Sequence, residues 1–265
     1  MTIPVVLTIS GHDPTGGAGI QADSEAIVAV GCRATSAVTC LTVQNTANVL
    51  QVFPSPPKLL ENQIRTLLDD MPVAAIKIGL IPDMAILLVI SRLLRDHPDI
   101  PTVLDPVLAS GDGTNLTGDL LLAGINKHLL PKVTLITPNS IEARRLSGAR
   151  LLDQCGQQLL SKGCGAVLIT GTHETGRKVI NRLYLPGTRV ITSSWPRLEG
   201  SYHGSGCTLA SAVAAFIASG DRLKTAVQRA LEYTWTSLTH GDRPGKGQLL
   251  PDRLFALRHL EVSDS

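Results

Sequence analysis

The chain has 265 residues and a formal net charge of +2 at pH 7, and 43% of its residues are hydrophobic while 17% are charged. These proportions are typical of a packed globular protein and exclude a disordered chain. The charges form no long run of one sign, and only 3% of the residues are aromatic, so the sequence offers no surface suited to nucleic acid.

The sequence also argues against membrane attachment and export. No segment has the length of an apolar membrane span, and residues 1–10 lack the basic start of a signal peptide. The five cysteines are odd in number and include no C-x-x-C pair, which argues against a disulfide framework and a zinc site. Because reduced thiols are typical of the cytoplasm, we expect a cytoplasmic protein.

Apolar runs of strand length alternate with amphipathic segments of helix length along the chain. The first half predicts a strand at 5–9, a helix at 20–30, strands at 36–43 and 49–53, a helix at 59–68, a strand at 74–78, a helix at 84–95 and a strand at 102–104. The second half predicts a helix at 118–130, a strand at 133–136, helices at 141–146 and 151–162, a strand at 166–169, a hairpin of 179–185 and 189–192, and helices at 207–218 and 223–239.

This alternation predicts one α/β domain, residues 1–265, in which helices cover both faces of a mainly parallel sheet. Ligands of such sheets bind beyond the carboxyl ends of the strands. The loops that follow strands are therefore where we look for chemistry.

The loop after the first strand, residues 11–19, reads G-H-D-P-T-G-G-A-G. Its glycines let the backbone approach a ligand closely, although the loop lacks the G-K-[ST] of a P-loop and the spacing G-x-G-x-x-G. A flexible strand-to-helix turn is the alternative. Asp23, one turn into the next helix, could direct its carboxylate at this loop or simply favour the helix dipole at the surface.

A second candidate site is Gly204-Ser205-Gly206-Cys207, directly before a helix rich in small residues. Free backbone N–H groups and the positive helix end would meet there, which suits the negative charge of a phosphoryl group in transfer. The helix dipole should lower the pKa of the Cys207 thiol. The alternative is a glycine-containing turn with a buried structural cysteine.

Two further strand ends carry acidic residues. Asn139 and Glu142 can form a capping box, or they can orient Mg²⁺ and its waters near nucleotide phosphates. The sequence alone does not separate these interpretations. Asp105 follows the strand at 102–104 and could contact Mg²⁺ or cap a loop.

Two more polar residues lie in or directly after predicted strands. Lys77 lies inside the strand at 74–78, where a lysine is rarely buried without a partner. We expect its ammonium either to reach the site or to pair with an acid such as Asp105. Gln44 ends a strand at the same edge and could read the donors and acceptors of a heterocycle, although such residues are usually solvated.

Six segments occur in the same order as in a known family. They are T-I-S-G-H-D-P-T-G-G-A-G-I-Q-A-D (8–23), V-Q-N-T (43–46), I-K-I-G-L (76–80), L-D-P-V (104–107), T-P-N-S-I-E-A (137–143) and H-G-S-G-C-T-L-A-S-A (203–212). Together they resemble the hydroxymethylpyrimidine/phosphomethylpyrimidine kinases of thiamine synthesis. The resemblance extends from residue 5 to about residue 245.

The resemblance implies a ribokinase-like fold, a three-layer αβα sandwich with a mainly parallel central sheet and a short β flap, residues 179–192, over the nucleotide site. It implies ATP as co-substrate and Mg²⁺ as cofactor. The substrates would be 4-amino-5-hydroxymethyl-2-methylpyrimidine and then its monophosphate, and the assembly would be a homodimer.

The resemblance also assigns residues to three groups. The pyrimidine would be held by Gly11, Ala18, Asp23, Val43, Gln44 and Val107. We place Lys77, Asp105, Asn139, Glu142, Thr170 and His173 at the nucleotide, with Asp105 and Glu142 at the metal. The anion hole would be formed by Gly204, Ser205, Gly206 and Cys207. Because Cys207 stands where related sugar kinases carry an Asp general base, we expect it to orient the substrate hydroxyl, with late proton transfer.

One position departs from the family pattern. Many members carry Lys at the place of Thr170, within K-G-G-H, where this chain reads T-G-T-H. That Lys would neutralise phosphate charge, and His173, Arg177 or Lys178 could substitute for it. The second phosphorylation is the step most exposed to this change, because its substrate already carries negative charge.

Two other functions remain open. Pyridoxal kinase shares the fold and acts on a flat heterocycle with a hydroxymethyl arm, but its relatives usually end the anion-hole motif in Asp rather than in a residue such as Cys207. A non-catalytic pyrimidine-binding sensor is favoured only by Thr170. Ligand binding without ATP turnover would identify the sensor.

Overall fold

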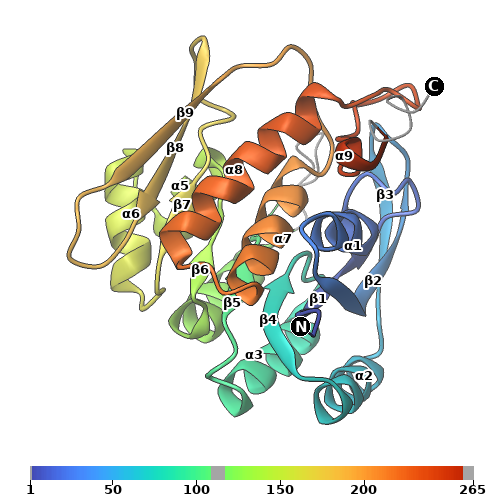
Figure 1. Ribbon diagram of the computed structural model, residues 1–265. Helices are drawn as coiled ribbons and strands as arrows, with labels where there is room; N and C mark the ends of the chain where they lie inside the picture. The colour runs from blue at the N-terminus through green and yellow to red at the C-terminus, as the bar shows by residue number, and fades with distance from the viewer. Residues whose placement is uncertain (1, 109–116, 259–265) are drawn as a thin grey trace.

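The computed structural model describes residues 2–108 and 117–258 (Figure 1). The strands are β1 (Val5–His12), β2 (Arg33–Gln44), β3 (Val49–Pro54), β4 (Val73–Ile78), β5 (Thr102–Leu104), β6 (Leu135–Ile136), β7 (Val167–Ile169), β8 (Lys178–Tyr184) and β9 (Ile191–Pro196). The α-helices are α1 (Gly19–Ala29), α2 (Pro57–Asp70), α3 (Met84–Asp96), α4 (Asp119–Gly124), α5 (Ser140–Ser147), α6 (Leu152–Ser161), α7 (Ser205–Ala218), α8 (Leu223–Thr239) and α9 (Phe255–Arg258).

The strands of the described residues form one sheet in the order β3-β2-β1-β4-β5-β6-β7-β8-β9. Neighbouring strands from β2 to β7 are parallel. The outer pairs β2–β3, β7–β8 and β8–β9 are antiparallel. The predicted mainly parallel sheet is confirmed, and its carboxyl edge collects the loops after β1, β4, β5, β6 and β7.

Helices cover both faces of the sheet (Figure 1). On one face α1, α7 and α8 pack together, and the core there includes Ile27, Val213 and Leu231. On the other face α2, α3, α5 and α6 bury residues such as Ile90 and Leu159. Successive residues of a strand point to opposite faces, which is why the parallel strands are apolar on both sides. The predicted three-layer αβα sandwich is confirmed.

The hairpin near residue 186 differs from the prediction. Its second strand is Ile191–Pro196 rather than 189–192, and its first strand pairs with β7 through contacts such as Val167↔Tyr184. Leu183 and Tyr184 are 2% exposed. Because these side chains are buried in the core, β8 and β9 continue the central sheet and do not form a separate flap over the nucleotide site.

The predicted helix at 118–130 is also divided. It consists of α4, a π-helical turn (Ile125–Leu129) and a 3₁₀ turn (Leu130–Lys132), and Pro131 cannot donate the backbone bond that would continue an α-helix. Among the helices that the structure describes, none combines the length and the apolar character that crossing a lipid bilayer requires.

Candidate active site

The glycine-rich loop between β1 and α1 (residues 11–19) is held in shape by one buried carboxylate. Asp13 accepts hydrogen bonds from the backbone N–H of Thr15 and of Ala18 and from the Thr15 hydroxyl, each 2.8 Å long. His203 Nε2 lies 2.7 Å from Asp13 Oδ2. Burial raises the pKa of Asp13, but the bonds to His203 and Thr15 outweigh it, so that the pKa is lowered. The loop is thus tied to the turn before α7.

The glycine-rich loop and the N-terminus of α7 touch at two glycines. Gly204 is the N-cap of α7 and has φ +76°, in the region that favours glycine. A Cβ on Gly204 would stand 1.9 Å from the carbonyl oxygen of Gly17. The first bond of the helix runs from the Thr208 N–H to the Gly204 carbonyl (2.9 Å), so the N–H groups of residues 205–207 precede the helical ladder. Together with the positive helix end, these groups make up the predicted anion hole (residues 204–207).

A buried charge cluster lies under the sheet edge. Lys77 Nζ lies 2.7 Å from Asp23 Oδ1 and 4.0 Å from Asp105 Oδ2. Asp23 also accepts hydrogen bonds from the hydroxyls of Thr8 (2.6 Å) and Ser211 (2.8 Å). Burial acts to lower the pKa of Lys77, but Asp23 and Asp105 outweigh it and raise the pKa. Lys77 therefore pairs with an acid as predicted, and its main partner is Asp23.

This cluster corrects two predicted roles. The side chains of Asp23 and Lys77 are both 0% exposed. Asp23 was predicted to hold the pyrimidine and Lys77 to contact the nucleotide, but three partners inside the core occupy the Asp23 carboxylate, and the Lys77 ammonium faces that carboxylate. Both residues support the site from below and do not line it.

Asp105 is the member of the cluster that reaches the anion hole. It lies directly after β5 and is 5% exposed, and its Oδ2 accepts no hydrogen bond among the described residues. A Cβ on Gly206 would stand 3.5 Å from Asp105 Oδ1, so this carboxylate sits beside the N-terminus of α7. Burial raises the pKa of Asp105, against the opposing effect of Lys77.

Cys207 joins these parts, but its ionisation differs from the prediction. Burial raises the pKa of the Cys207 thiol to about 12, although the Lys77 charge acts in the opposite direction. The expected lowering by the helix dipole is wrong, because burial outweighs favourable charge. The thiol lies close to the Asp105 carboxylate and to the Gly19 N–H. At pH 7 it is neutral and cannot act as a thiolate base.

The N-terminus of α5 carries the predicted capping box. Asn139 Oδ1 accepts hydrogen bonds from the N–H groups of Ile141 (2.9 Å) and Glu142 (3.0 Å), and Glu142 Oε2 accepts from the Asn139 N–H (2.9 Å). Glu142 Oε1 accepts from the Leu108 N–H (3.4 Å). Burial and the nearby charge of Asp105 raise the pKa of Glu142 to about 8. The capping prediction is confirmed, and the same carboxylate is electrostatically coupled to Asp105.

Asp105 and Glu142 were the two residues predicted to bind Mg²⁺. The described residues contain no group of three or more His, Cys, Asp or Glu side chains that could hold a metal ion alone. Mg²⁺ is, however, commonly bound through one or two carboxylates together with phosphates and water. The unbonded Oδ2 of Asp105 and the repulsion between the two carboxylates fit a cation of that kind.

The loop after β7 (residues 170–177) holds two predicted nucleotide residues. Thr170 donates its backbone N–H to the Pro138 carbonyl (3.0 Å) and bridges to Asn139, so it lies beside the N-terminus of α5. His173 is exposed. Partial burial and the neighbouring Arg197 lower the pKa of His173. A histidine that is neutral at pH 7 cannot replace the charge of the missing lysine.

Two arginines hold this loop in place. Arg144 of α5 forms a bidentate pair with Glu174, with bonds of 2.8 and 3.0 Å, and this pairing lowers the pKa of Glu174 to about 2. Arg197 donates hydrogen bonds to the carbonyls of Thr172, Glu174 and Gly176 at 2.6–2.8 Å. The loop is therefore rigidly placed next to α5, while Arg177 and Lys178 remain exposed.

The other predicted pyrimidine residues lie at the same sheet edge. Gly11 is buried at the end of β1, and Gly19 approaches its carbonyl so closely that a Cβ there would be 2.3 Å away. Val43, which is 45% exposed, and Gln44 lie on the part of β2 beyond the β1 end, since His12 pairs with Leu41. Ala18 and Val107 are half-buried in the loops after β1 and β5.

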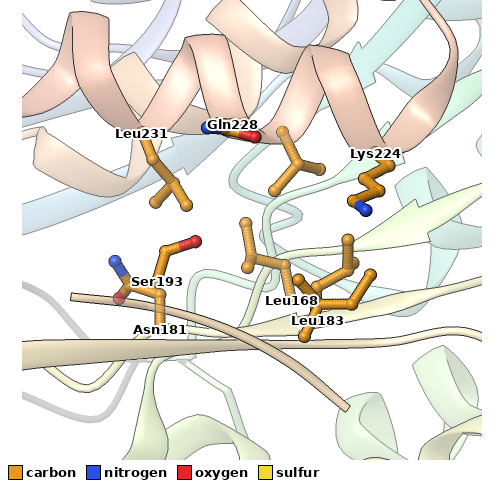
Figure 2. A pocket seen from close by; sticks show the side chains of 9 residues that line it. Leu168, Asn181, Leu183, Ser193, Lys224, Gln228 and Leu231 are labelled. Atoms are coloured by element: carbon orange, nitrogen blue, oxygen red, sulfur yellow. The ribbon is translucent and has the colours of Figure 1, made fainter. Parts of the chain in front are cut away.

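A small cavity lies elsewhere, between α8 and strands β7 to β9. Figure 2 shows Leu168, Leu183 and Leu231 pointing into it. Its volume of about 20 Å³ is room for about one water molecule. It is too small for a nucleotide or a heterocycle and plays no part in the site.

Some residues that build the site were not identified in the sequence. Asp13 lies within a motif that was singled out, but its loop-clamping role needs the three-dimensional distances. His203 was noted only as part of the motif 203–212, and its contact with Asp13 shows that it helps to hold the glycine-rich loop. Arg253 lies beyond the recognised motifs and is 3% exposed; no local pattern in the sequence marks it.

The chain is similar to proteins of one known family. The family model described as phosphomethylpyrimidine kinase matches residues 13–252. A hydroxymethylpyrimidine/phosphomethylpyrimidine kinase from Streptomyces coelicolor is 36% identical over 253 residues, which are 93% of this chain and 93% of the relative.

Two solved structures are similar over most of the chain. The ADP complex of Bacillus subtilis pyridoxal kinase has a TM-score of 0.89 and 28% identity, covering 97% of this chain and 99% of the other. A phosphomethylpyrimidine kinase from Clostridium difficile has a TM-score of 0.78 and 31% identity, covering 89% and 100%. These similarities support the ribokinase-like fold.

Proposed function

This chain belongs to the phosphomethylpyrimidine kinase family, and from that premise we propose that it transfers the γ-phosphoryl group of ATP to 4-amino-5-hydroxymethyl-2-methylpyrimidine and then to the monophosphate. The observation that carries the proposal is the meeting of three features at one point. They are the glycine-rich loop, the N–H groups of residues 205–207, and the Asp105 carboxylate.

The chemistry follows from what each feature does. The N–H groups and the positive end of α7 stabilise the charge that develops on the transferring phosphoryl group. The neutral Cys207 thiol orients the substrate hydroxyl and does not remove its proton, since its pKa is raised to about 12. This fits a loose transition state in which the proton leaves late. A Cys207→Ala variant with unchanged kcat would contradict the role of the thiol.

Asp105 and Glu142 would hold Mg²⁺ together with phosphate oxygens and water. The ion would supply charge neutralisation at the β- and γ-phosphates. Asn139 and Thr170 lie beside Glu142 and would place the nucleotide phosphates at the N-terminus of α5. Of the residues considered as substitutes for the family's lysine, Arg177 and Lys178 are the better candidates, because they are basic residues with exposed side chains at the end of this loop.

The pyrimidine would bind at the β1–β2 end of the sheet edge. Gln44 carries the donors and acceptors that read the heterocycle, and Val43 and Val107 supply apolar contacts to the ring. Gly11 and Ala18 contribute backbone. Asp23 is left out of this group, because its carboxylate is buried with Lys77.

Pyridoxal is the second candidate substrate, because the Bacillus subtilis pyridoxal kinase shares the fold over nearly the whole chain. The experiment is ADP release by the purified protein with Mg²⁺ and ATP, compared for hydroxymethylpyrimidine, its monophosphate and pyridoxal. We expect turnover of the first two. Turnover of pyridoxal alone would move the protein to vitamin B6 chemistry, and pyrimidine binding without turnover would identify a sensor.

We further propose a homodimer and a cytoplasmic location. Leu41, Leu50 and Phe53 expose 54–64% of their surface on the β2–β3 hairpin, and β3 ends the sheet with an open edge. Exposed apolar edge strands are usually covered in native proteins, and a second copy would cover this one. Light scattering of the purified protein would return twice the 28.1 kDa chain mass. The five buried, unpaired cysteines are in keeping with a reducing compartment.

A further inference from the structure

Arg253 is a buried arginine that the proposed chemistry does not use. Its side chain is 2% exposed, and its salt-bridge partner is Glu25, whose side chain is 42% exposed. An arginine stays charged at all physiological pH values, and burying a charge is costly unless hydrogen bonds compensate it. The buried guanidinium of Arg253 therefore needs hydrogen-bond acceptors around it.

Those acceptors belong to both halves of the candidate active site. Arg253 Nε donates to the Thr208 hydroxyl (2.8 Å), in the first turn of α7. Nη1 donates to the Gly16 carbonyl (3.3 Å), and Nη2 donates to the Gly17 carbonyl. One rigid guanidinium thus spans the glycine-rich loop and the helix that carries the anion hole.

The surrounding contacts show that this junction is tight. A Cβ on Gly204 would stand 2.9 Å from Arg253 Nη2 as well as 1.9 Å from the Gly17 carbonyl oxygen. The Thr208 hydroxyl in turn donates to the Gly204 carbonyl (2.9 Å). The guanidinium therefore contacts the carbonyls and the turn that set the separation of the two glycines.

The chain that carries Arg253 is itself packed against the site. Gln248 donates its N–H to the Thr46 carbonyl (2.9 Å), beyond the end of β2, and the His203 N–H donates to the Leu249 carbonyl (2.9 Å). The segment 248–253 thus runs from the end of β2 to the turn before α7. Arg253 stands at its end.

We propose that Arg253 is a positioning residue that fixes the distance between the substrate loop and the anion hole, an inference that rests on the proposed kinase function. Each half binds its own ligand, so a loss of Arg253 leaves the two ligands bound but poorly aligned. Misplacement of reacting groups by about 1 Å can cost about 100-fold in rate. The expected signature is a fall in kcat with nearly unchanged ligand affinity.

The test compares Arg253→Lys with the wild type in ADP release at saturating pyrimidine and Mg-ATP, with dissociation constants measured separately by calorimetry. Lysine keeps the charge but loses the planar fork. We expect kcat to fall at least tenfold while both dissociation constants stay within threefold. Thr208→Val removes one hydrogen-bond acceptor of Arg253 and should also lower kcat. This variant provides the test if Arg253→Lys folds poorly.

Glu25→Gln is the matched control, because it removes the carboxylate partner and leaves the contacts of Arg253 with both loops. It should keep kcat within twofold. Two results would overturn the inference: an unchanged kcat in Arg253→Lys and Thr208→Val, or a loss explained entirely by weaker binding of one ligand. An inactive wild type would instead refute the proposed function.

Discussion

Lys77 is a fully buried ammonium that makes its close ion pair in the core. Its Nζ lies 2.7 Å from Asp23 Oδ1, and both side chains are 0% exposed. Removing two charges from water is costly, and the attraction offsets that cost only when the remaining polar atoms are satisfied. Thr8 and Ser211 complete the bonding of Asp23. The pair therefore holds β1, β4, α1 and α7 together beneath the anion hole.

Breaking this pair should destabilise the protein strongly. Lys77→Met keeps the length of the side chain but leaves the Asp23 charge buried without its partner, which typically costs about 3–5 kcal/mol. Urea unfolding followed by circular dichroism would measure the change. The double variant Asp23→Asn with Lys77→Met should lose less than the sum of the two single changes.

The matched control is Lys58→Met, whose lysine side chain is 77% exposed in its pair with Glu61. Exposed pairs contribute little to stability, so its unfolding midpoint should not change. If Lys77→Met were as stable as Lys58→Met, the buried pair would not have the structural role assigned to it.

The short helix α5 combines a structural and a chemical task in one carboxylate. Glu142 closes the capping box with Asn139, and it shares an electrostatic environment with Asp105, so that burial and Asp105 raise its pKa to about 8. In the unfolded chain a glutamate has a pKa of about 4.3. The folded protein therefore holds this proton more tightly than the unfolded chain.

The sign of the pH dependence follows from this difference. Between about pH 4.3 and 8 the folded state retains a proton that the unfolded chain has lost, so rising pH favours unfolding, by at most about 1.4 kcal/mol per pH unit for this group. Glu142→Gln cannot lose a proton, so its stability should decline less steeply. Urea unfolding at several pH values from 5.5 to 7.5 measures both slopes. Equal slopes in the variant and the wild type would contradict the raised pKa, and Glu232→Gln, at an exposed position of α8, is the control that should match the wild type.

The local elements could largely be predicted from the sequence, because apolar periodicity and capping residues are local signals. The helix α3, for instance, begins at Met84 as predicted, after an Asp83 cap that accepts the Ile86 N–H. The position of the β8–β9 hairpin could not be predicted, because it depends on the pairing of β8 with β7, which buries Leu183 on one face of the sheet and Tyr184 on the other. Such pairing is set by tertiary packing and not by local sequence.

At the scale of the whole molecule, the same limit explains which site residues were found. The motifs at residues 11–19, 137–143 and 203–212 meet at one sheet edge, as the parallel topology predicts. The sequence could not show whether a charged side chain at that edge faces a ligand or the core. Asp23 and Lys77 point inward, and Cys207 is too deeply buried for the helix dipole to lower its pKa. Arg253 bonds to Gly16 and Gly17, which lie more than 200 residues away in the sequence. No local sequence pattern could therefore predict its role.

The central claim is that phosphoryl transfer takes place where the glycine-rich loop meets the anion hole. Gly204 and Gly220 flank α7, and both have positive φ, +76° and +96°. A Cβ on Gly204 would meet the Gly17 carbonyl oxygen at 1.9 Å, whereas a Cβ on Gly220 would meet nothing within 4 Å. The two alanine variants therefore carry similar backbone strain but differ at the site.

The most direct measurement is ADP formation with hydroxymethylpyrimidine in the wild type, Gly204→Ala and Gly220→Ala. We predict turnover in the wild type, a kcat within about threefold of it in Gly220→Ala, and a fall of about 100-fold or more in Gly204→Ala, as expected when reacting groups are displaced by about 1 Å. A Gly204→Ala protein that turns over the pyrimidine at the wild-type rate would place the chemistry elsewhere and contradict the account.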